Sequence, residues 1–326
     1  MRLIVAESIA AAVSQRLAQQ QLPAELLVVD RDGRAVTHMN ASVTHATLAE
    51  ADALLLRGVS NAGLDRLLGV ARNLRWIHAS SAGIEHLLDR DLRQRELVVT
   101  NSAGVYAIPI AEWVIFALLL IVKRGPELLA MQRERRWHGA PELDELGGKT
   151  LTILGAGGIG VEVAKRAAAF DMRVWGINRR GRHIPHVERV ISGDGWRDAL
   201  RETDFLVIAT PLTPATRGLI GARELAMLPT HAWVINVARG AIVDEPALID
   251  ALRAQRIGGA ALDVFETEPL PPDSPFWSLP NVLIWPHHSG SSPRADDRML
   301  DLFIENVRRF MRGEALLNVV DLEAGY

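Results

Sequence analysis

Short apolar runs alternate with amphipathic stretches along the first hundred residues of the chain. Strands that alternate with helices in this way predict a parallel sheet with helices on both faces. The expected strands are 3–5, 26–29, 53–56, 76–78 and 97–99, and the expected helices are 8–20, 63–72 and 84–95. A longer apolar helix is predicted at 109–124.

A second and stronger alternation begins after residue 148. Its strand candidates are 150–154, 173–177, 204–208, 233–237, 260–264 and 282–284. Six strands separated by helices are typical of a doubly wound dinucleotide-binding fold. Asp244 is a suitable N-cap for a helix at 245–255, and 293–312 carries the apolar face of a final helix.

Size and composition narrow the class of protein. A chain of 326 residues exceeds what one hydrophobic core usually supports, so two domains are expected. The net charge of -3 gives no global attraction for nucleic acid or anionic lipid. The longest apolar run, 113–122, is about half the length of a membrane-spanning helix, so no membrane segment is expected. The absence of cysteine excludes disulfides and thiolate metal sites and suits a cytoplasmic protein.

A glycine-rich turn stands directly after the strand predicted at 150–154. Gly155, Gly157 and Gly160 form a GxGxxG run, with Gly158 and Ile159 inside it, and a helix is predicted to follow. The first glycine permits a tight turn, the second lets backbone amides approach a pyrophosphate, and the third lets helix pack on strand. Glycine-rich turns are common by themselves. Between a strand and a helix, however, this one predicts a dinucleotide site.

The strand at 173–177 is followed by Asn178, Arg179 and Arg180. An acid at this point would bind the ribose diol of NAD, and the chain has none here. Arg179 or Arg180 could instead pair with the 2′-phosphate of NADP. We therefore predict NADP(H) as the preferred cofactor, with NAD(H) as the alternative. The competing interpretation is that these are solvated loop arginines in an arginine-rich chain.

Three residues with acid–base chemistry follow apolar runs near the C-terminal end. Arg239, Glu268 and His287 offer a fixed cation, a carboxylate and an imidazole, each expected at the end of a strand. Acid–base chemistry on a small anionic substrate needs these groups. Glu266 competes with Glu268 for the acid role, and His288 competes with His287.

The motifs of this chain resemble those of the D-isomer-specific 2-hydroxyacid dehydrogenases, which include glyoxylate/hydroxypyruvate reductases and phosphoglycerate dehydrogenases. The most specific segments are 154–160, 236–240, 262–269 and 280–287. The resemblance implies an α/β fold in which a Rossmann cofactor domain with a doubly wound parallel sheet is inserted into a smaller flavodoxin-like substrate domain. The cofactor domain would span 102–287, and the substrate domain 1–101 plus 288–326.

The resemblance also assigns roles to the acid–base residues. Arg239 would bind the substrate carboxylate and polarise the C2 carbonyl, while His287 donates a proton as hydride arrives at C2. Glu268 would pair with His287, and the family frames favour Glu268 over Glu266 and His287 over His288. A carboxylate beside an imidazole favours the charged imidazolium, which is the form that a general acid requires.

Further contacts follow from the same resemblance. The loop at Ser81, Ala82 and Gly83 ends a predicted strand, so its backbone amides could hold a carboxylate, and Arg57 is a second, weaker substrate contact. The cofactor residues would include Thr210, Ala238 and Asp263, although an aspartate at a strand end could simply cap a turn. No metal site is expected.

The expected activity is hydride transfer between NAD(P)H and a small 2-oxo acid such as glyoxylate or hydroxypyruvate. The resemblance implies a homodimer built through 108–122, though an internal helix would carry the same apolar pattern. Trp285 departs from relatives, which often have a small polar residue there. The alternatives are a phosphoglycerate-type dehydrogenase without a regulatory domain and an NAD(P)-sensing, corepressor-like interaction protein.

Overall fold

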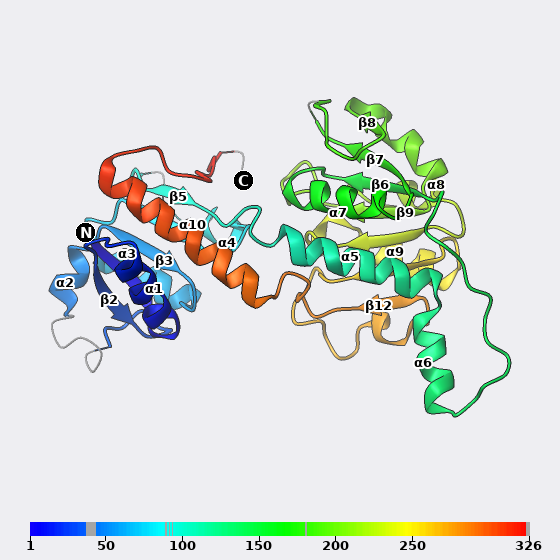
Figure 1. Cartoon of the computed structure of the whole chain (residues 1–326), viewed down its shortest axis with the longest axis horizontal. Coiled ribbons are helices and arrows are strands. Elements are labelled where there is room, and N and C mark those ends of the chain that lie inside the picture. The colour runs from blue at the N-terminus through cyan, green and yellow to red at the C-terminus, as the bar shows by residue number, and fades with distance from the viewer. Residues whose placement is uncertain (37–43, 89, 91, 93, 180, 324–326) are drawn as a thin grey trace. The chain divides into compact units, whose positions relative to one another are not determined.

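Two compact units make up the chain (Figure 1). The structure is a computed structural model that describes residues 1–36, 44–88, 90, 92, 94–179 and 181–323. Unit 1 contains Met1–Val105 and Ser292–Tyr326, and unit 2 contains Tyr106–Ser291. Each unit has its own sheet of parallel strands. None of the helices described is long and apolar enough to cross a membrane.

The sheet of unit 1 has five parallel strands in the order β2-β1-β3-β4-β5. This is the strand order of flavodoxin-like folds. All-parallel strands are covered on both faces, which explains why these segments read as short continuous apolar runs. The strands are β1 (Arg2–Ala6), β2 (Glu25–Val29), β3 (Ala53–Leu56), β4 (Trp76–Ala79) and β5 (Val98–Thr100).

Helices from both ends of the chain cover this sheet. The last helix, α10 (Pro293–Arg312), packs beside the first, α1 (Glu7–Gln19). Phe303 of α10 is fully buried and stacks on Trp76 of β4, with 5.5 Å between the ring centroids. The C-terminal helix is therefore part of the core of unit 1. The remaining helices are α2 (His45–Ala49), α3 (Asn61–Val70) and α4 (Glu85–Leu88).

The sheet of unit 2 has seven parallel strands in the order β12-β11-β10-β9-β6-β7-β8. The order reverses at β6, as it does in a doubly wound Rossmann sheet, so the predicted fold class is confirmed. The strands are β6 (Thr150–Leu154), β7 (Arg173–Ile177), β8 (Arg189–Ile191), β9 (Phe205–Ile208), β10 (Trp233–Asn236), β11 (Gly259–Leu262) and β12 (Val282–Ile284). The helices are α5 (Ala107–Val122), α6 (Gly125–Arg133), α7 (Gly158–Ala168), α8 (Ala222–Met227) and α9 (Glu245–Arg253), with 3-10 turns at Gly193–Glu202, Gly240–Ile242 and Pro275–Ser278.

Two sequence predictions of secondary structure were wrong. The sheet of unit 2 has a seventh strand, β8, that the pattern did not reveal, because it begins with Arg189 and so carries only two consecutive apolar residues. The helix expected through residue 95 ends at Leu88, and residues 94–96 form a turn. By contrast, the side chain of Asp244 accepts a hydrogen bond from the amide of Ala247 at 3.0 Å, so its N-cap prediction is confirmed.

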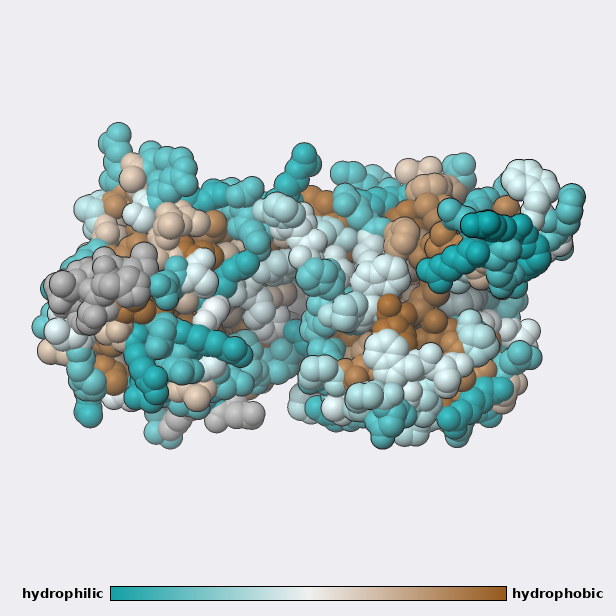
Figure 2. Space-filling model, turned by 90° about the horizontal axis from the view of Figure 1, so that it is seen from below, coloured by the Kyte–Doolittle hydropathy of each residue, from teal (hydrophilic) through white to brown (hydrophobic). Residues whose placement is uncertain are grey.

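The long helix α5 packs on α7 within its own unit. Trp113, Val114 and Leu118 are buried there, which accounts for most of the apolar pattern of α5. Phe116 of the same helix is 44% exposed, and Figure 2 shows apolar patches lying within a largely hydrophilic face. Leu129 within α6 and Trp137 and Leu143 soon after it are also exposed.

Candidate functional site

The glycine turn between β6 and α7 lies at the point where the strand order of unit 2 reverses. Gly155 has a φ of +95°, and a β-carbon there would lie 2.5 Å from the amide nitrogen of Thr210, which follows β9. A β-carbon at Gly160 would lie 2.8 Å from the carbonyl oxygen of Gly155. Only glycine fits either position, because a side chain would separate the turn from β9 or α7 from β6. The crevice at such a reversal is where open α/β sheets bind ligands.

Gly157 differs from Gly155 and Gly160 because a side chain at this position would point into open space. A β-carbon built there would meet no atom within 4 Å, and α7 begins at the next residue, Gly158. An exposed backbone before a helix N-terminus is the setting in which amides bind a pyrophosphate. Ile159 lies in the first turn of the helix and is partly buried. The residues of this turn fit the phosphates of a dinucleotide.

The turn after β7 is closed by the side chain of Asn178. Its Nδ2 donates to the carbonyl oxygen of Arg182 at 2.9 Å, and its Oδ1 accepts from the amide of Arg182 at 3.2 Å. Arg179 is exposed on this turn, and Arg180 lies outside the described residues. Since both ends of the Asn178 amide are engaged by the backbone, its contribution is to shape the turn.

Asn236, the last residue of β10, shapes the loop that carries Arg239. Its Nδ2 donates to the carbonyl oxygen of Arg239 at 2.9 Å, and its Oδ1 accepts from the amide of Ala238 at 3.0 Å. The guanidinium of Arg239 donates to the carbonyl oxygen of Ala238 at 2.6 Å. Sequence reasoning missed the role of Asn236. The available signal was an amide side chain inside an otherwise apolar run.

Gly240 brings this loop against the loop that carries Glu268. A β-carbon at Gly240 would lie 1.9 Å from the carbonyl carbon of Phe265 and 2.1 Å from the amide nitrogen of Glu266. The two loops therefore touch through their backbones, with no room for a side chain. The position of Arg239 is thus tied to that of Glu268.

Glu268 joins the backbone of its own loop to the imidazole of His287. Its Oε1 accepts from the amide of Phe265 at 2.9 Å, and its Oε2 lies 2.7 Å from Nδ1 of His287. When Nδ1 donates to the carboxylate, Nε2 is the ring atom left to exchange a proton with a substrate. The expectation that Glu268 closes a strand was wrong, because β11 ends at Leu262 and Glu268 lies in the following loop. The Glu268–Pro269 peptide bond is cis.

Asp263 holds the turn on which His287 stands. Its backbone oxygen accepts from the amide of His287 at 2.7 Å, and its Oδ1 accepts from the amides of His288 and Ser289 at 2.8 and 3.1 Å. Oδ2 accepts from the hydroxyl of Ser289. These bonds fix His287 at a φ of +52°, in the left-handed region where non-glycine residues persist only if their surroundings hold them. Asp263 is 2% exposed, so its carboxylate caps this turn.

Glu266 and His288, the alternatives to Glu268 and His287, make different contacts. The amide of Glu266 donates to Oε1 of Glu245 at 2.6 Å. Partial burial raises the pKa of Glu245, and the negative charges of Glu266 and Glu268 raise it further, against the opposing effect of this hydrogen bond. The side chain of His288 is exposed, and it is His287 that contacts Glu268.

Trp285 is directed onto helix α5. Its ring meets Trp113 and Phe116 edge-on, each with 5.5 Å between ring centroids. Trp285 therefore packs the end of β12, an edge strand, against α5. Among the described residues there is no cluster of histidine or acidic side chains that could hold a metal ion.

The remaining candidates belong to unit 1. Ser81, Ala82 and Gly83 form the loop between β4 and α4, and the hydroxyl of Ser81 donates to the carbonyl oxygen of Gly83 at 2.6 Å. Arg57 follows β3 and forms an ion pair with Asp296 of α10 at 2.7 Å. This pairing gives Arg57 a structural role within its own unit.

Comparison with known proteins identifies a family of dehydrogenases. The family model of the "D-isomer specific 2-hydroxyacid dehydrogenase, NAD binding domain" matches residues 115–289. A glyoxylate reductase of Thermofilum pendens is 36% identical over 268 residues, which cover 77% of this chain and 77% of that protein.

Solved structures agree over the whole chain. A D-isomer specific 2-hydroxyacid dehydrogenase of Xanthobacter autotrophicus Py2, in complex with NADPH and MES, superposes with a TM-score of 0.84 at 31% identity, covering 100% of this chain and 99% of that one. An NADPH-dependent glyoxylate/hydroxypyruvate reductase of Sinorhizobium meliloti, in complex with NADP and sulfate, gives 0.82 at 28% identity with the same coverage.

Proposed function

The chain belongs to the D-isomer specific 2-hydroxyacid dehydrogenase family, and we propose that it reduces a small 2-oxo acid, such as glyoxylate or hydroxypyruvate, with NADPH in preference to NADH. Membership makes it an NAD(P)-dependent oxidoreductase with an NAD-binding domain. The observation that carries the proposed reaction is the 2.7 Å contact between Nδ1 of His287 and Oε2 of Glu268. It gives an imidazole the partner that a general acid needs.

The proposed mechanism uses three side chains of unit 2. The bound nicotinamide supplies a hydride to C2 of the 2-oxo acid. The guanidinium of Arg239 binds the substrate carboxylate and stabilises the negative charge that develops on the C2 oxygen. Nε2 of His287 gives its proton to that oxygen, while Glu268 holds the ring through Nδ1 and favours the charged imidazolium. In the reverse reaction the neutral ring of His287 accepts the proton of the hydroxy acid.

The proposed preference for NADPH rests on the turn after β7. Asn178 stands where an acid would bind the ribose diol of NAD, and both ends of its amide hold the backbone of Arg182. Arg179 is exposed on the same turn and offers a bidentate partner to the 2′-phosphate of NADP. Without a carboxylate in this turn, the phosphate meets no repulsion there.

For the carboxylate of the substrate we propose a second contact, the backbone amides of Ser81, Ala82 and Gly83. This loop belongs to unit 1, which we assign as the substrate domain, with boundaries near 1–101 and 288–326. Unit 2, near 102–287, is the proposed cofactor domain. Arg57 contributes less, because its guanidinium is paired with Asp296 at 2.7 Å.

We also propose that the enzyme is a cytoplasmic homodimer. Most of the apolar surface of helix α5 is buried inside unit 2. The support for a dimer therefore comes from exposed apolar side chains in and after α6. Trp137 is 88% exposed, and Leu129 and Leu143 are each about half exposed. All three belong to the stretch of chain 129–143, and large exposed apolar patches mark interaction sites.

The test is a matrix of 2-oxo acids against NADPH and NADH, following loss of absorbance of the reduced cofactor. The proposal expects turnover with glyoxylate or hydroxypyruvate and a higher kcat/KM with NADPH. Turnover confined to a phosphorylated hydroxy or oxo acid would favour a phosphoglycerate-type enzyme. Binding of NADPH without any turnover would contradict the proposal and favour a cofactor-sensing interaction protein.

A further inference from the structure

The loop at 80–83 is held from behind by the residues that follow β5. The amide of Ser102 donates to the carbonyl oxygen of Ser81 at 3.0 Å, and Nδ2 of Asn101 donates to that of Ala82 at 2.8 Å. Within a planar trans peptide the N–H points opposite to the C=O. Fixing these two carbonyls therefore turns the amides of Ala82 and Gly83 away from Asn101 and Ser102. Among the residues that the structure describes, none accepts a hydrogen bond from either amide.

Asn101 is in turn held by Asn318, near the end of the chain. The amide of Asn101 donates to the carbonyl oxygen of Asn318 at 3.1 Å. Nδ2 of Asn318 donates to the carbonyl oxygens of Asn101 and Ala103 at 3.2 and 2.9 Å. Beside this contact, Val319 forms an antiparallel bridge with Thr100, so the segment runs along the free edge of β5. Asn101, which bonds to the loop at 80–83, is thus itself held in place by Asn318.

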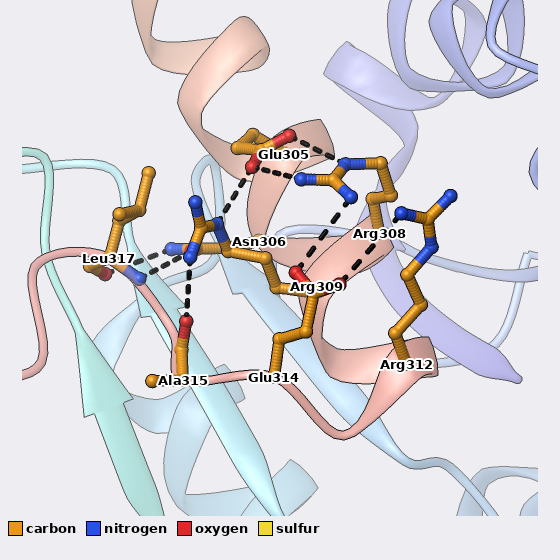
Figure 3. Close-up of polar contacts among 8 residues, drawn as sticks. All are labelled: Glu305, Asn306, Arg308, Arg309, Arg312, Glu314, Ala315 and Leu317. Carbon is orange, nitrogen blue, oxygen red and sulfur yellow. Dashed lines mark hydrogen bonds and ion pairs between the residues drawn. The ribbon is translucent and has the colours of Figure 1, made fainter.

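Side chains of α10 anchor the same C-terminal segment (Figure 3). Asn306 is fully buried, donates to the carbonyl oxygen of Leu317 at 3.0 Å, and accepts from its amide at 2.7 Å. Arg309 donates to the carbonyl oxygen of Ala315 at 3.1 Å and to Glu305 at 2.7 Å. Arg308 and Arg309, through their hydrogen bonds, lower the pKa of Glu305 to about 2. The backbone of the segment is therefore held at Ala315 and Leu317 by α10, and at Asn318 and Val319 by the edge of β5.

We propose that residues 314–320, called the C-terminal strap below, position the loop at 80–83. In this role Asn318 and Asn101 are positioning residues for substrate binding. The bonds run from Asn306 to Leu317, from Asn318 to Asn101, and from Asn101 to Ala82. In this proposal no atom of the strap contacts the substrate. It acts by keeping the amides of Ala82 and Gly83 turned outward. This inference rests on the proposed function, in which those amides hold the carboxylate of a 2-oxo acid.

The variants are chosen to separate positioning from folding. Asn318 has a φ of +54°, so Asn318→Gly removes the side chain while relieving the backbone. Asn318→Asp keeps the shape of the side chain and removes the two donated hydrogen bonds. The matched control is Arg312→Ala, because Arg312 is an exposed residue whose contact with Glu314 of the strap is a 3.8 Å ion pair.

The measurements are KM and kcat for the preferred 2-oxo acid, and Kd for NADPH and for oxamate, a non-reducible analogue of glyoxylate. Both Asn318 variants are expected to raise the KM and the oxamate Kd about tenfold, since a misplacement of about 1 Å can cost about 10²-fold and a smaller shift costs less. The Kd of NADPH should stay within about twofold, and Arg312→Ala should leave all four values unchanged.

Hydrogen exchange tests the strap without any substrate. The amide of Ser102 bonds to Ser81, so Asn318→Gly is expected to speed exchange in the segment 100–105 while exchange in the β6–α7 turn stays the same. Unchanged exchange in the segment 100–105 would contradict the proposed role of the strap. So would unchanged KM and oxamate Kd in the Asn318 variants, provided that the wild type binds oxamate. A wild-type protein that binds no oxamate and turns over no 2-oxo acid instead overturns the proposed function, and exchange still reports on the strap.

Discussion

Gly240 packs directly on the backbone of Phe265, where a β-carbon would lie only 1.9 Å from the Phe265 carbonyl carbon. Arg239 precedes this contact, and Glu268 follows it three residues later. Two of the three proposed catalytic residues are therefore placed by one backbone contact, which neither side chain makes. Any change at Gly240 should displace both loops together.

Gly240→Ala is predicted to cost unit 2 roughly 3 kcal/mol or more of stability, because overpacking against rigid backbone cannot be relieved by a rotamer change. It should also lower kcat/KM in the protein that remains folded. The measurement is urea unfolding together with the reductase assay. The control is Gly69→Ala in α3, where a β-carbon meets nothing within 4 Å and alanine is the better helix former. Equal effects of the two substitutions would contradict this reading of Gly240.

His287→Ala and Glu268→Gln are predicted to lower kcat by roughly 10²-fold or more, because the first removes the proton donor and the second removes its charged partner. His288→Ala and Glu266→Gln serve as matched controls. Their side chains are exposed within the same two loops, and they should keep kcat within about threefold. Activity is measured by steady-state kinetics at saturating NADPH. A His288 variant as impaired as the His287 variant would reverse the assignment.

Arg179→Ala is predicted to raise the KM of NADPH about tenfold or more and to leave the KM of NADH nearly unchanged. The physical reason is the loss of a charge-assisted bond to the 2′-phosphate, which NADH lacks. The control is Arg223→Ala, at an exposed position at the start of α8. A parallel loss for both cofactors would mean that Arg179 acts through the shape of the turn and not through the phosphate.

His78 is predicted to make unit 1 sensitive to acid. It is fully buried on β4, its Nδ1 lies 2.7 Å from the hydroxyl of Thr100, and burial lowers its pKa from 6.5 to about 4. Below pH 6.5 His78 binds a proton in the unfolded chain but stays neutral in the folded chain. The free energy of unfolding therefore falls as the pH drops toward 4. Between pH 7.5 and 5 the loss is about 2 kcal/mol.

The measurement for His78 is the free energy of unfolding of wild type and His78→Asn at both pH values. The variant should be less stable at pH 7.5, because asparagine fills the site poorly. The difference between the two proteins should then shrink by about 2 kcal/mol at pH 5. A difference that does not change with pH would show that the pKa of His78 is the same in the folded and the unfolded state.

Trp137→Ser combined with Leu143→Ser is predicted to shift the protein from dimer toward monomer, because both side chains are at least half exposed in the proposed interface. Sedimentation velocity over a range of protein concentrations measures the shift. Phe170→Ser is the control, since Phe170 is also exposed but lies just after α7. A wild-type protein that sediments as a monomer at all concentrations would refute the dimer.

The fold and the dinucleotide site could be predicted from the sequence because both are encoded locally. Strands such as Phe205–Ile208 are continuous apolar runs, and the glycine run stands directly between a strand and a helix. Gly155 and Gly160 prove to be positions where a β-carbon would strike backbone, so the local pattern and the tertiary contact agree. Local patterns failed at β8, which has only two consecutive apolar residues, and after Leu88, where the amphipathic pattern continues to residue 95 but the helix does not.

By itself, the sequence determined the family, the two parallel sheets and the kinds of side chain available for chemistry. The family frames favoured Glu268 over Glu266, and in the tertiary structure it is Glu268 that contacts His287. Only the tertiary structure decided that the carboxylate of Asp263 holds the turn that carries His287. The reason is that the contacts of Glu268 and Asp263 join loops that follow two different strands, so they depend on sheet order and on the path of each loop. The bond between Asn318 and Asn101 spans 217 positions, and no local pattern carries information over that distance.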